Sequence, residues 1–490
     1  MFTITLDFYN KLANEDIFED QIFDFDGQTL SVNQFKSEWI TFKNCTFNCK
    51  NLEFKNIQNE KLTLEFYNCI FNCNVSFLYS TLDNLRFKNT KALKSLNIGS
   101  GISKLKLNVF EFSNDSEIEK PELSTDFNIR NTNFEIFIFE YINHTNGMFR
   151  FLGNTILKQD SNGNISSFGG STITNILFYN NTFGKYANFK RVIFNSTENL
   201  KPPGSGFEFP GFYKNNFAKV SFSQSKFTCT FQFENCDFLS TTSFENCKNL
   251  DNSKLKFVAC EFKGFSLFNK SKINFLDIDR CTFDKSSSFT DTEFNTLKLF
   301  EVKFGGGAYF DEMKINKVLD KSYLKNNSEI LEWKRTLRAI KQELQKTENK
   351  IDFNRFRSYE LAAHYQELDW KWNSGFIDKS ILFAAKISTD FGNSWRKALR
   401  FTIVSGFLIY LFLYIIENRK FSIDTLNWNN WERLLSGFFR FLLVTDFYNP
   451  LETDRIYLTN PLSWLILIFG KIVIAFGIYE MIQSFRKFKA

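Results

Sequence analysis

The chain has 490 residues, enough for two or three domains, and it carries 64 Phe against only 4 Met and 6 Pro. So many aromatic side chains need a regular core in which to stack, so internal repeats are expected. Residues 1–310 hold 33 Lys and Arg against 34 Asp and Glu, whereas the remainder holds 27 against 20, so the basic excess is C-terminal. The acidic first twenty residues lack the basic start of a secretory signal.

Residues 1–31 are expected to cap a repeat domain, because solenoids need a polar end. From residue 32 to residue 310, large apolar residues recur every five positions, a period that neither a helix nor an isolated strand has. Phe212 to Phe233 spans 21 residues and Phe233 to Phe257 spans 24, so four steps and an occasional bulge complete one coil. The residues predicted to point inward are Phe212, Phe217, Phe222, Phe227, Phe268, Phe283, Phe289, Phe294 and Phe304.

A small residue often lies two positions before the large one, as Cys45, Cys69 and Ser225 do. Asn, which tolerates turn conformations, is frequent in between, as in FKNC, FYNC and FENC. On these residues the chain resembles the pentapeptide-repeat family, which implies a mainly β solenoid, a right-handed four-sided β-helix. Some members protect gyrase by mimicking DNA, a role that needs a strongly acidic surface. A region with a net charge of −1 lacks that surface, and no nucleic-acid partner is expected.

Two cysteine pairs, Cys45 with Cys49 and Cys69 with Cys73, have a spacing that could supply a four-thiolate zinc site. The alternative is favoured: Cys45 and Cys69 take the small inward position, whereas Cys49 and Cys73 are expected on the opposite side of the strand. Four thiols so placed cannot face one ion. Neither a metal nor another cofactor is therefore expected, and disulfides are not expected in a cytosolic domain.

Catalysis finds little support in the sequence. Its two histidines are His144, expected in a loop, and His364, expected on a helix, and a surface or packing role is the default for both. Asp277 and Asp279 alternate with apolar residues, which indicates the solvated face of a strand. No nucleophile, phosphate-loop or metalloprotease motif occurs, so an enzyme is not expected.

Residues 311–391 change to helical periodicity and are predicted to be a helical linker. Apolar residues from Ile330 to Leu344, and again from Leu361 to Trp372, recur at steps of three and four, which predicts a helical hairpin. A further helix after Gly375 has Ile377 and Ile381 on one face. Such a juxtamembrane amphipathic helix can lie along a membrane, although a third soluble helix fits these residues equally well.

Residues 392–490 are predicted to be a membrane domain with two spans. The stretches 398–416 and 462–479 are long and apolar enough to cross the ~30 Å hydrocarbon layer. The basic residues expected at the membrane interface are Arg396, Lys397, Arg400, Arg486, Lys487 and Lys489. The positive-inside rule then places both termini, and the repeat domain, in the cytosol.

A short helix over 430–446 is predicted to dip into the membrane between the spans, since it is too apolar for a loop and too short to cross. This order resembles the two-helix, pore-loop module of potassium channels, and the stretch FNRFRSYELAAHYQELDW resembles the linker of bacterial proteins that join such a module to pentapeptide repeats. The channel filter motif T-V-G-Y-G is replaced by VTDFYNP, without glycine. Candidate pore or intramembrane residues are Thr445, Asp446, Tyr448 and Lys471.

The charge of Lys471 needs a partner, because the residue lies in the middle of the second apolar span. One possible partner is Asp446, at the end of the short helix. Another is the carbonyl end of that helix, where a cation is favoured. The alternative is that the side chain bends toward the membrane interface and has no partner.

Two function classes follow. In the first, a cytosolic β-helix senses or gates a homo-oligomeric, channel-like module in a bacterial cytoplasmic membrane, a tetramer that is not potassium-selective or is degenerate. A ring of Lys471 near the pore axis would then favour weak or anion-leaning conductance. In the second, the spans anchor a non-conducting scaffold in the bilayer, and the β-helix binds another, unknown protein.

Overall fold

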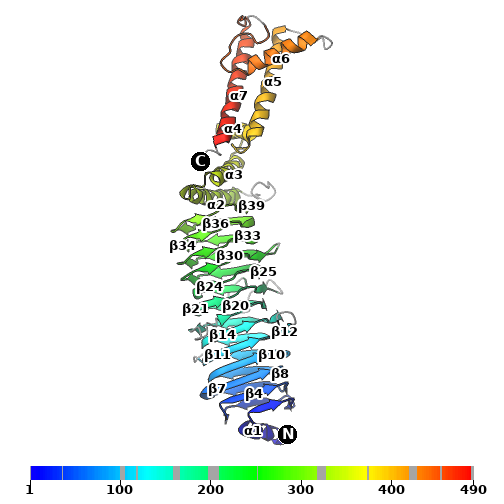
Figure 1. Cartoon of the computed structure of the whole chain (residues 1–490), viewed down its shortest axis with the longest axis vertical. Helices are drawn as coiled ribbons and strands as arrows, with labels where there is room; N and C mark the ends of the chain where they lie inside the picture. Colours follow the sequence, from blue (N-terminus) through cyan, green and yellow to red (C-terminus); the bar gives the residue numbers. More distant parts are fainter. Residues whose placement is uncertain are drawn as a thin grey trace. The chain divides into compact units, whose positions relative to one another are not determined.

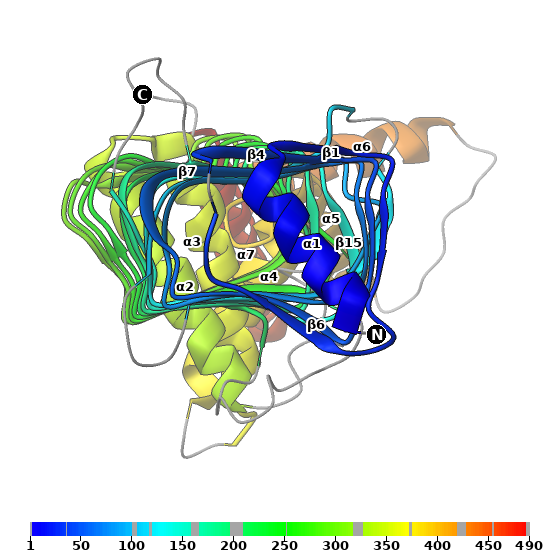
Figure 2. The same ribbon diagram turned by 90° about the horizontal axis from the view of Figure 1, so that it is seen from below.

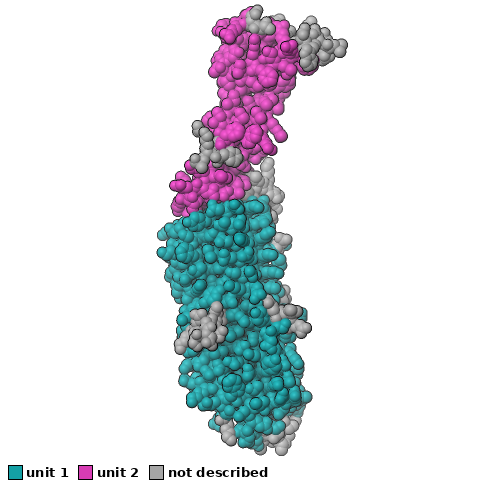
Figure 3. All heavy atoms as spheres, in the orientation of Figure 1, with its two compact units in different colours: residues 1–318 teal, residues 319–490 magenta. Residues whose placement is uncertain are grey.

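The computed structural model describes residues 2–35, 37–99, 105–116, 120–157, 166–196, 209–250, 252–316, 327–371, 375–418, 428–452 and 455–486. The chain divides into two compact units, residues 1–318 and residues 319–490 (Figure 3). The first unit is a parallel β-solenoid of about 12 turns. The second unit contains six helices in its described residues. The predicted fold class, a β-solenoid followed by helices that include two long apolar ones, is confirmed.

The solenoid begins with helix α1 (Phe2–Asn14), which covers the end of the stack. Phe8 and Leu12 are buried, and the Phe8 ring packs edge-on against Phe23 and Phe25 at centroid distances of 4.9 Å and 5.3 Å. Figure 2 shows α1 lying across the four-sided outline of the first turns. The strands begin at Ile17, inside the segment that the sequence assigns to the cap.

The strands form two parallel ladders, in which each strand pairs with strands from neighbouring turns of the coil (Figure 1). The first ladder contains β1 (Ile17–Glu19), β4 (Trp39–Lys43), β7 (Gln58–Tyr67), β9 (Thr81–Lys88), β11 (Leu105–Ser113), β14 (Thr132–Glu140), β17 (Thr155–Ile156), β18 (Ser166–Ser167), β21 (Thr182–Asn188), β24 (Asn216–Ser221), β27 (Asp237–Phe238), β28 (Thr242–Ser243), β31 (Glu261–Phe262), β32 (Ser266–Leu267), β34 (Thr282–Phe283), β35 (Ser287–Ser288), β37 (Lys303–Phe304) and β38 (Ala308–Tyr309). The second ladder contains β2 (Ile22–Asp24), β3 (Thr29–Val32), β5 (Thr46–Asn48), β6 (Asn51–Lys55), β8 (Ile70–Leu78), β10 (Ala92–Ile98), β12 (Glu122–Ser124), β13 (Asp126–Arg130), β15 (Asn143–Asn146), β16 (Phe149–Leu152), β19 (Thr172–Thr174), β20 (Ile176–Tyr179), β22 (Ile193–Asn195), β23 (Gly211–Tyr213), β25 (Lys226–Phe227), β26 (Phe231–Glu234), β29 (Lys248–Asn249), β30 (Lys254–Val258), β33 (Lys272–Asp279), β36 (Glu293–Phe300) and β39 (Lys314–Ile315).

The large residues that recur every five positions fill the interior of the coil. Phe212 pairs in register with Phe233, and their rings stack at 5.2 Å. Phe217 pairs in the same way with Phe238, at 5.3 Å. The nine inward positions named from the sequence are all buried. Eight of them make stacked, tilted or edge-on ring contacts within an aromatic core, whereas Phe294 lies between Ile273 and Ile315 of the neighbouring turns. Such a core accounts for the abundance of Phe.

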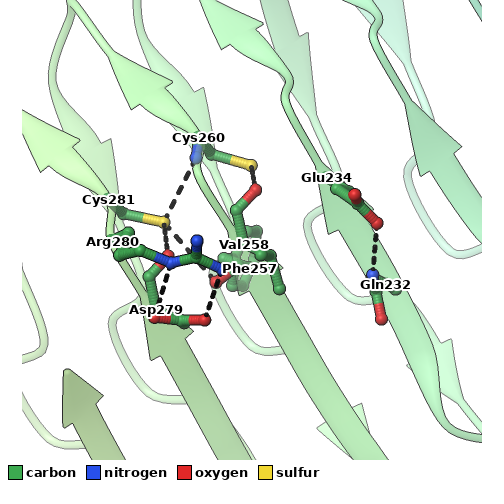
Figure 4. Close-up of polar contacts among 8 residues, drawn as sticks. All are labelled: Gln232, Glu234, Phe257, Val258, Cys260, Asp279, Arg280 and Cys281. Carbon is green, nitrogen blue, oxygen red and sulfur yellow. Dashed lines mark hydrogen bonds and ion pairs between the residues drawn. The ribbon is translucent and has the colours of Figure 1, made fainter.

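The small inward residue supplies a hydrogen-bond donor to the turn before it. The Cys260 thiol donates to the carbonyl oxygen of Phe233 at 3.4 Å. The Cys281 thiol donates in the same way to that of Phe257 at 3.5 Å (Figure 4). The Ser225 hydroxyl makes the same bond to Phe189 at 2.6 Å. Cys and Ser therefore suit this position because they are small and satisfy a buried carbonyl that would otherwise be costly.

Asparagines turn the chain at the corners. Asn44, Asn68, Asn235 and Asn246 all have φ between 51° and 55°, the left-handed region that Asn tolerates better than most residues. The Asn68 side chain donates to Asn44 Oδ1 at 3.2 Å, and so links one corner to the next. The frequent Asn that follows the strands thus has a conformational role.

His144 lies in strand β15, so its expected position in a loop is wrong. It is buried, its Nε2 lies 2.8 Å from the Thr125 carbonyl oxygen, and its Nδ1 accepts from the Thr174 amide at 3.1 Å. This pattern requires the neutral ring with the proton on Nε2. The histidine takes a position inside the coil and bridges its neighbouring turns, which is a packing role.

Solenoid stability should fall as the pH drops from about 7 towards 5. Burial lowers the pKa of His144, so the unfolded chain, whose histidine pKa is about 6.5, takes up the proton first. The free energy of unfolding then decreases by up to about 1.4 kcal/mol per pH unit from this group. Urea titrations followed by β-sheet circular dichroism at several pH values check this result. The variant His144→Gln should show a flatter pH dependence, and an unchanged slope would contradict the assignment.

The second unit contains α2 (Asn327–Lys346), α3 (Lys350–Glu367), α4 (Phe376–Thr389), α5 (Trp395–Asn418), α6 (Trp428–Leu442) and α7 (Pro461–Arg486). Helices α2 and α3 form the predicted hairpin, in which Trp333, Leu337 and Ile340 are buried. Helix α3 begins at Lys350, before Leu361, the first apolar position of the second predicted helix, and the Asn349 side chain caps it by accepting from the Asp352 amide. The predicted position Trp372 lies outside the described residues.

Candidate membrane module and its buried ammonium

Two helices of the second unit are long and apolar enough to cross a membrane. Residues Trp395–Glu417 of α5 and Pro461–Phe485 of α7 have mean hydropathies of 2.0 and 2.1. The two helices pack against each other (Figure 1), and the Trp395 ring at the start of α5 stacks on Phe485 near the end of α7 at 5.5 Å. Their arrangement is that of an antiparallel pair.

Four of the six predicted interfacial basic residues lie in the described part of the chain, at the same end of this pair. Arg396, Lys397 and Arg400 are exposed, and Lys397 pairs with Asp390 at 3.0 Å. Arg486 is the last residue of α7, at the end that packs beside the start of α5. Lys487 and Lys489 lie outside the described residues. The described cations of this set are thus concentrated where α5 begins.

Helix α4 presents apolar side chains outward next to that basic end. Ile377 and Ile381 are 73% and 60% exposed. Lys379 and Lys386 lie on another face, and their ammonium groups are 5.3 Å and 4.7 Å from the centroid of the Tyr365 ring. An exposed apolar face with lysines drawn away from it is the pattern of a helix that lies in a membrane interface.

Helix α6 is short and packs on both apolar helices. Leu434, Phe438 and Phe441 join a buried cluster with Tyr410 of α5 and Leu467 of α7. The Tyr410 hydroxyl donates to the carbonyl oxygen of Leu434 at 3.1 Å. Figure 1 shows α6 inclined against α5 and α7. The helix overlaps the segment predicted to re-enter between the spans, with bounds Trp428–Leu442.

Two glycines permit this close approach. A Cβ at Gly437 of α6 would lie 2.4 Å from the Pro450 carbonyl oxygen and 2.4 Å from the Tyr410 hydroxyl. A Cβ at Gly470 of α7 would lie 2.4 Å from the Phe441 ring. Both positions exclude side chains because helix packing and a backbone crossing occupy the space. Neither glycine belongs to a motif or a repeat that would mark it in the sequence.

Lys471 caps the C-terminal end of α6. Its ammonium group donates to the carbonyl oxygens of Phe441 at 2.8 Å and Leu443 at 2.6 Å, with Arg440 at 3.4 Å. The side chain is 4% exposed, although Lys471 is in the middle of the apolar helix α7. The last carbonyls of a helix lack intrahelical partners and carry partial negative charge, so a buried cation is favoured there.

The residues after α6, which include three of the predicted pore or intramembrane residues, form a turn. Thr445 is exposed, whereas Asp446 and Tyr448 are half-buried, and the Tyr448 amide donates to Asp446 Oδ1 at 3.1 Å. Asn449 is buried, and its amide donates to the Ile456 carbonyl oxygen at 2.8 Å. Side-chain and backbone bonds within the turn thus take up its polar groups.

A carboxylate holds this turn to the polar face of α6. Glu452 pairs with Arg433 at 2.7 Å, and the Arg440 guanidinium donates to the Glu452 backbone oxygen at 2.6 Å.

Of the two partners predicted for Lys471, the observed one is the carbonyl end of α6, and the ammonium does not donate to Asp446. Lys471 therefore interacts with backbone dipoles of its own chain.

Eight of the nine cysteines are buried in the core, Cys229 is half-buried, and one prediction about the cysteines is wrong. Cys49 and Cys73 point inward and are buried, because each lies two residues after an inward Phe and strand alternation continues. Burial raises the pKa of Cys247 to about 12, which keeps its thiol protonated as a donor. Within the described ranges, no three His, Cys, Asp or Glu side chains are close enough together to hold a metal ion.

Comparisons with models of protein families, with curated proteins and with solved structures find no match to this chain. The site is therefore characterised by its geometry. It consists of two apolar helices, a short inclined helix that packs on both, and a buried ammonium at the end of that short helix.

Proposed function

We propose that the chain is a membrane-anchored β-solenoid protein whose C-terminal module has a channel-like arrangement but does not pass cations. Helices α5 and α7 would anchor it in a bilayer, and the solenoid would present a binding surface to a protein partner. The single observation that carries the non-conducting part is the bond from Lys471 to the carbonyl end of α6. In a channel-like module, a permeating cation would be favoured at the carbonyl end of this short helix. In this chain the ammonium group of Lys471 occupies that position instead.

The conducting alternative is a homo-oligomer, a tetramer in the channel-like case, with a solenoid that senses or gates. The exposed apolar face of α5 and α7, which includes Leu408, Phe412, Leu465 and Phe469, suits either lipid or a second copy. Conduction through such an assembly would require the Lys471 ammonium to leave its carbonyls. Each bond to a charged group is worth about 1.5–3 kcal/mol, so this alternative is the less favoured.

The anchored topology predicts where each part of the chain lies. With both termini in the cytosol of a bacterial cell, a reporter fused after Ala490 should be cytosolic and a tag near Thr453 should be external. A fragment ending at Asp320 should be soluble, because it lacks α4, α5 and α7. The full chain should stay with the membrane fraction after a salt wash. Retention of the fragment in washed membranes would show that the anchor lies elsewhere.

A further inference from the structure

The hairpin of α2 and α3 contains a cavity lined mainly by cations. Its volume is about 310 Å³, and its lining includes Lys334, Arg338 and Lys341 of α2 and Arg357 of α3. The α2 residues are spaced by four and three, so they share one helix face. Arg357 and His364 of α3, seven residues apart, also lie on one face. The two faces meet across the cavity.

Carboxylates neutralise only part of this charge. Glu360 pairs with Arg338 at 3.1 Å and also with Lys341, and Glu367 pairs with Lys334. Four cationic side chains face two carboxylates, which leaves a net charge of +2 with His364 neutral. A hairpin stabilised only by internal ion pairs would have equal numbers of positive and negative side chains here. The excess positive charge instead lines an open cavity.

Two arginine side chains of the cavity lining have N–H donors that a ligand can reach. Arg357 is exposed and makes no ion pair with another described residue. Arg338 donates to Glu360 through Nε, and its side chain is 54% exposed. Guanidinium forks match the oxygens of phosphate groups, and the adjacent ammonium groups of Lys334 and Lys341 add point charges.

We propose that the cavity between α2 and α3 binds a phosphate-bearing anion through Arg338 and Arg357. The volume and the several cations suit a compact group with more than one negative charge, such as a diphosphate or a phosphate monoester. The same chemistry occurs in soluble phosphate compounds and in lipid headgroups. Such binding is independent of whether the membrane module conducts.

The test uses the full chain in nanodiscs of neutral phosphatidylcholine, with pyrophosphate as the probe and calorimetry as the readout. Wild type should bind pyrophosphate, more weakly at higher ionic strength. Arg357→Gln and Arg338→Gln should each weaken binding about tenfold or more, because each removes a charge-assisted contact. Lys346→Gln, which removes the same charge from α2 outside the cavity, should change the affinity by less than about twofold, because its ammonium pairs with Glu343 instead.

Two further measurements make the result decisive. Helical circular dichroism of each variant must match wild type, so that lost binding is not lost folding. Nanodiscs containing phosphatidic acid should compete with pyrophosphate if the natural ligand is a headgroup, whereas equal amounts of phosphatidylserine should not. Absence of competition indicates a soluble ligand. No binding of pyrophosphate by wild type, or equal losses in Arg357→Gln and Lys346→Gln, would overturn the proposal.

Discussion

Phe222→Ala should destabilise the solenoid by about 3–5 kcal/mol, the usual cost of deleting a buried aromatic ring. The Phe222 ring is fully buried and stacks on Phe189 at 4.9 Å and on Phe244 at 4.8 Å, so its removal breaks the aromatic column in both directions. Each turn of a solenoid depends on its neighbours, and the loss is therefore felt across adjacent turns. Urea unfolding followed by β-sheet circular dichroism measures the change.

Lys219→Ala is the matched control for this variant. Lys219 lies three residues earlier, in strand β24, and is exposed, with its ammonium 5.4 Å from the centroid of the Tyr186 ring. An exposed cation–π contact contributes about 0.5–1 kcal/mol, so the control should change stability by no more than that. Similar losses in the two variants would contradict the inward assignment of Phe222 and the outward assignment of Lys219.

Lys471→Ala should have the largest effect on the membrane module. The substitution leaves the carbonyl oxygens of Phe441 and Leu443 without their donor in apolar surroundings, which costs about 1–3 kcal/mol for each unsatisfied group. The module should unfold at a lower temperature, and the vacated carbonyl end of α6 should attract cations. Thermal unfolding in detergent and cation flux into proteoliposomes measure the two consequences.

The variant Lys471→Arg tests whether the positive charge alone is sufficient or whether the compact shape of the ammonium is also needed. The variant keeps a cation but replaces a compact ammonium with a planar fork, which fits the three converging carbonyls less well. We expect intermediate stability and no cation flux. If Lys471→Ala is as stable as wild type, the ammonium does not cap α6, and the structural role assigned to it is wrong.

The solenoid could be predicted because the spacing of its large apolar residues recurs along the sequence. Many copies of a five-residue spacing, with offsets of 21 and 24 residues, are enough to define the four faces of a coil. Helix α1 could not be predicted in this way. Thr3, Ile4 and Thr5 have low helix propensity, and the packing of Phe8 on Phe23 outweighs it. The inward side of Cys49 was missed because the repeat pattern marks only one small residue on each face.

The candidate site was only partly predictable. The mid-helix position of Lys471 indicates from sequence alone that its charge needs a partner. Which partner it finds depends on how α6 crosses α7, and this crossing depends on Gly437 and Gly470, whose importance appears only in three dimensions. The basic cavity of the hairpin was missed for a similar reason. Its cations come from two helices, and neither helix alone has an unusual charge pattern.

A tethered ammonium at the cation-attracting end of α6 should keep the anchored module from conducting cations. Potassium flux through purified wild-type protein in liposomes, recorded beside Lys471→Ala, tests this most directly. We expect no potassium flux from wild type across pH and voltage, and measurable cation flux from Lys471→Ala. A potassium current from wild type that Lys471→Ala leaves unchanged would contradict the proposed role of the ammonium.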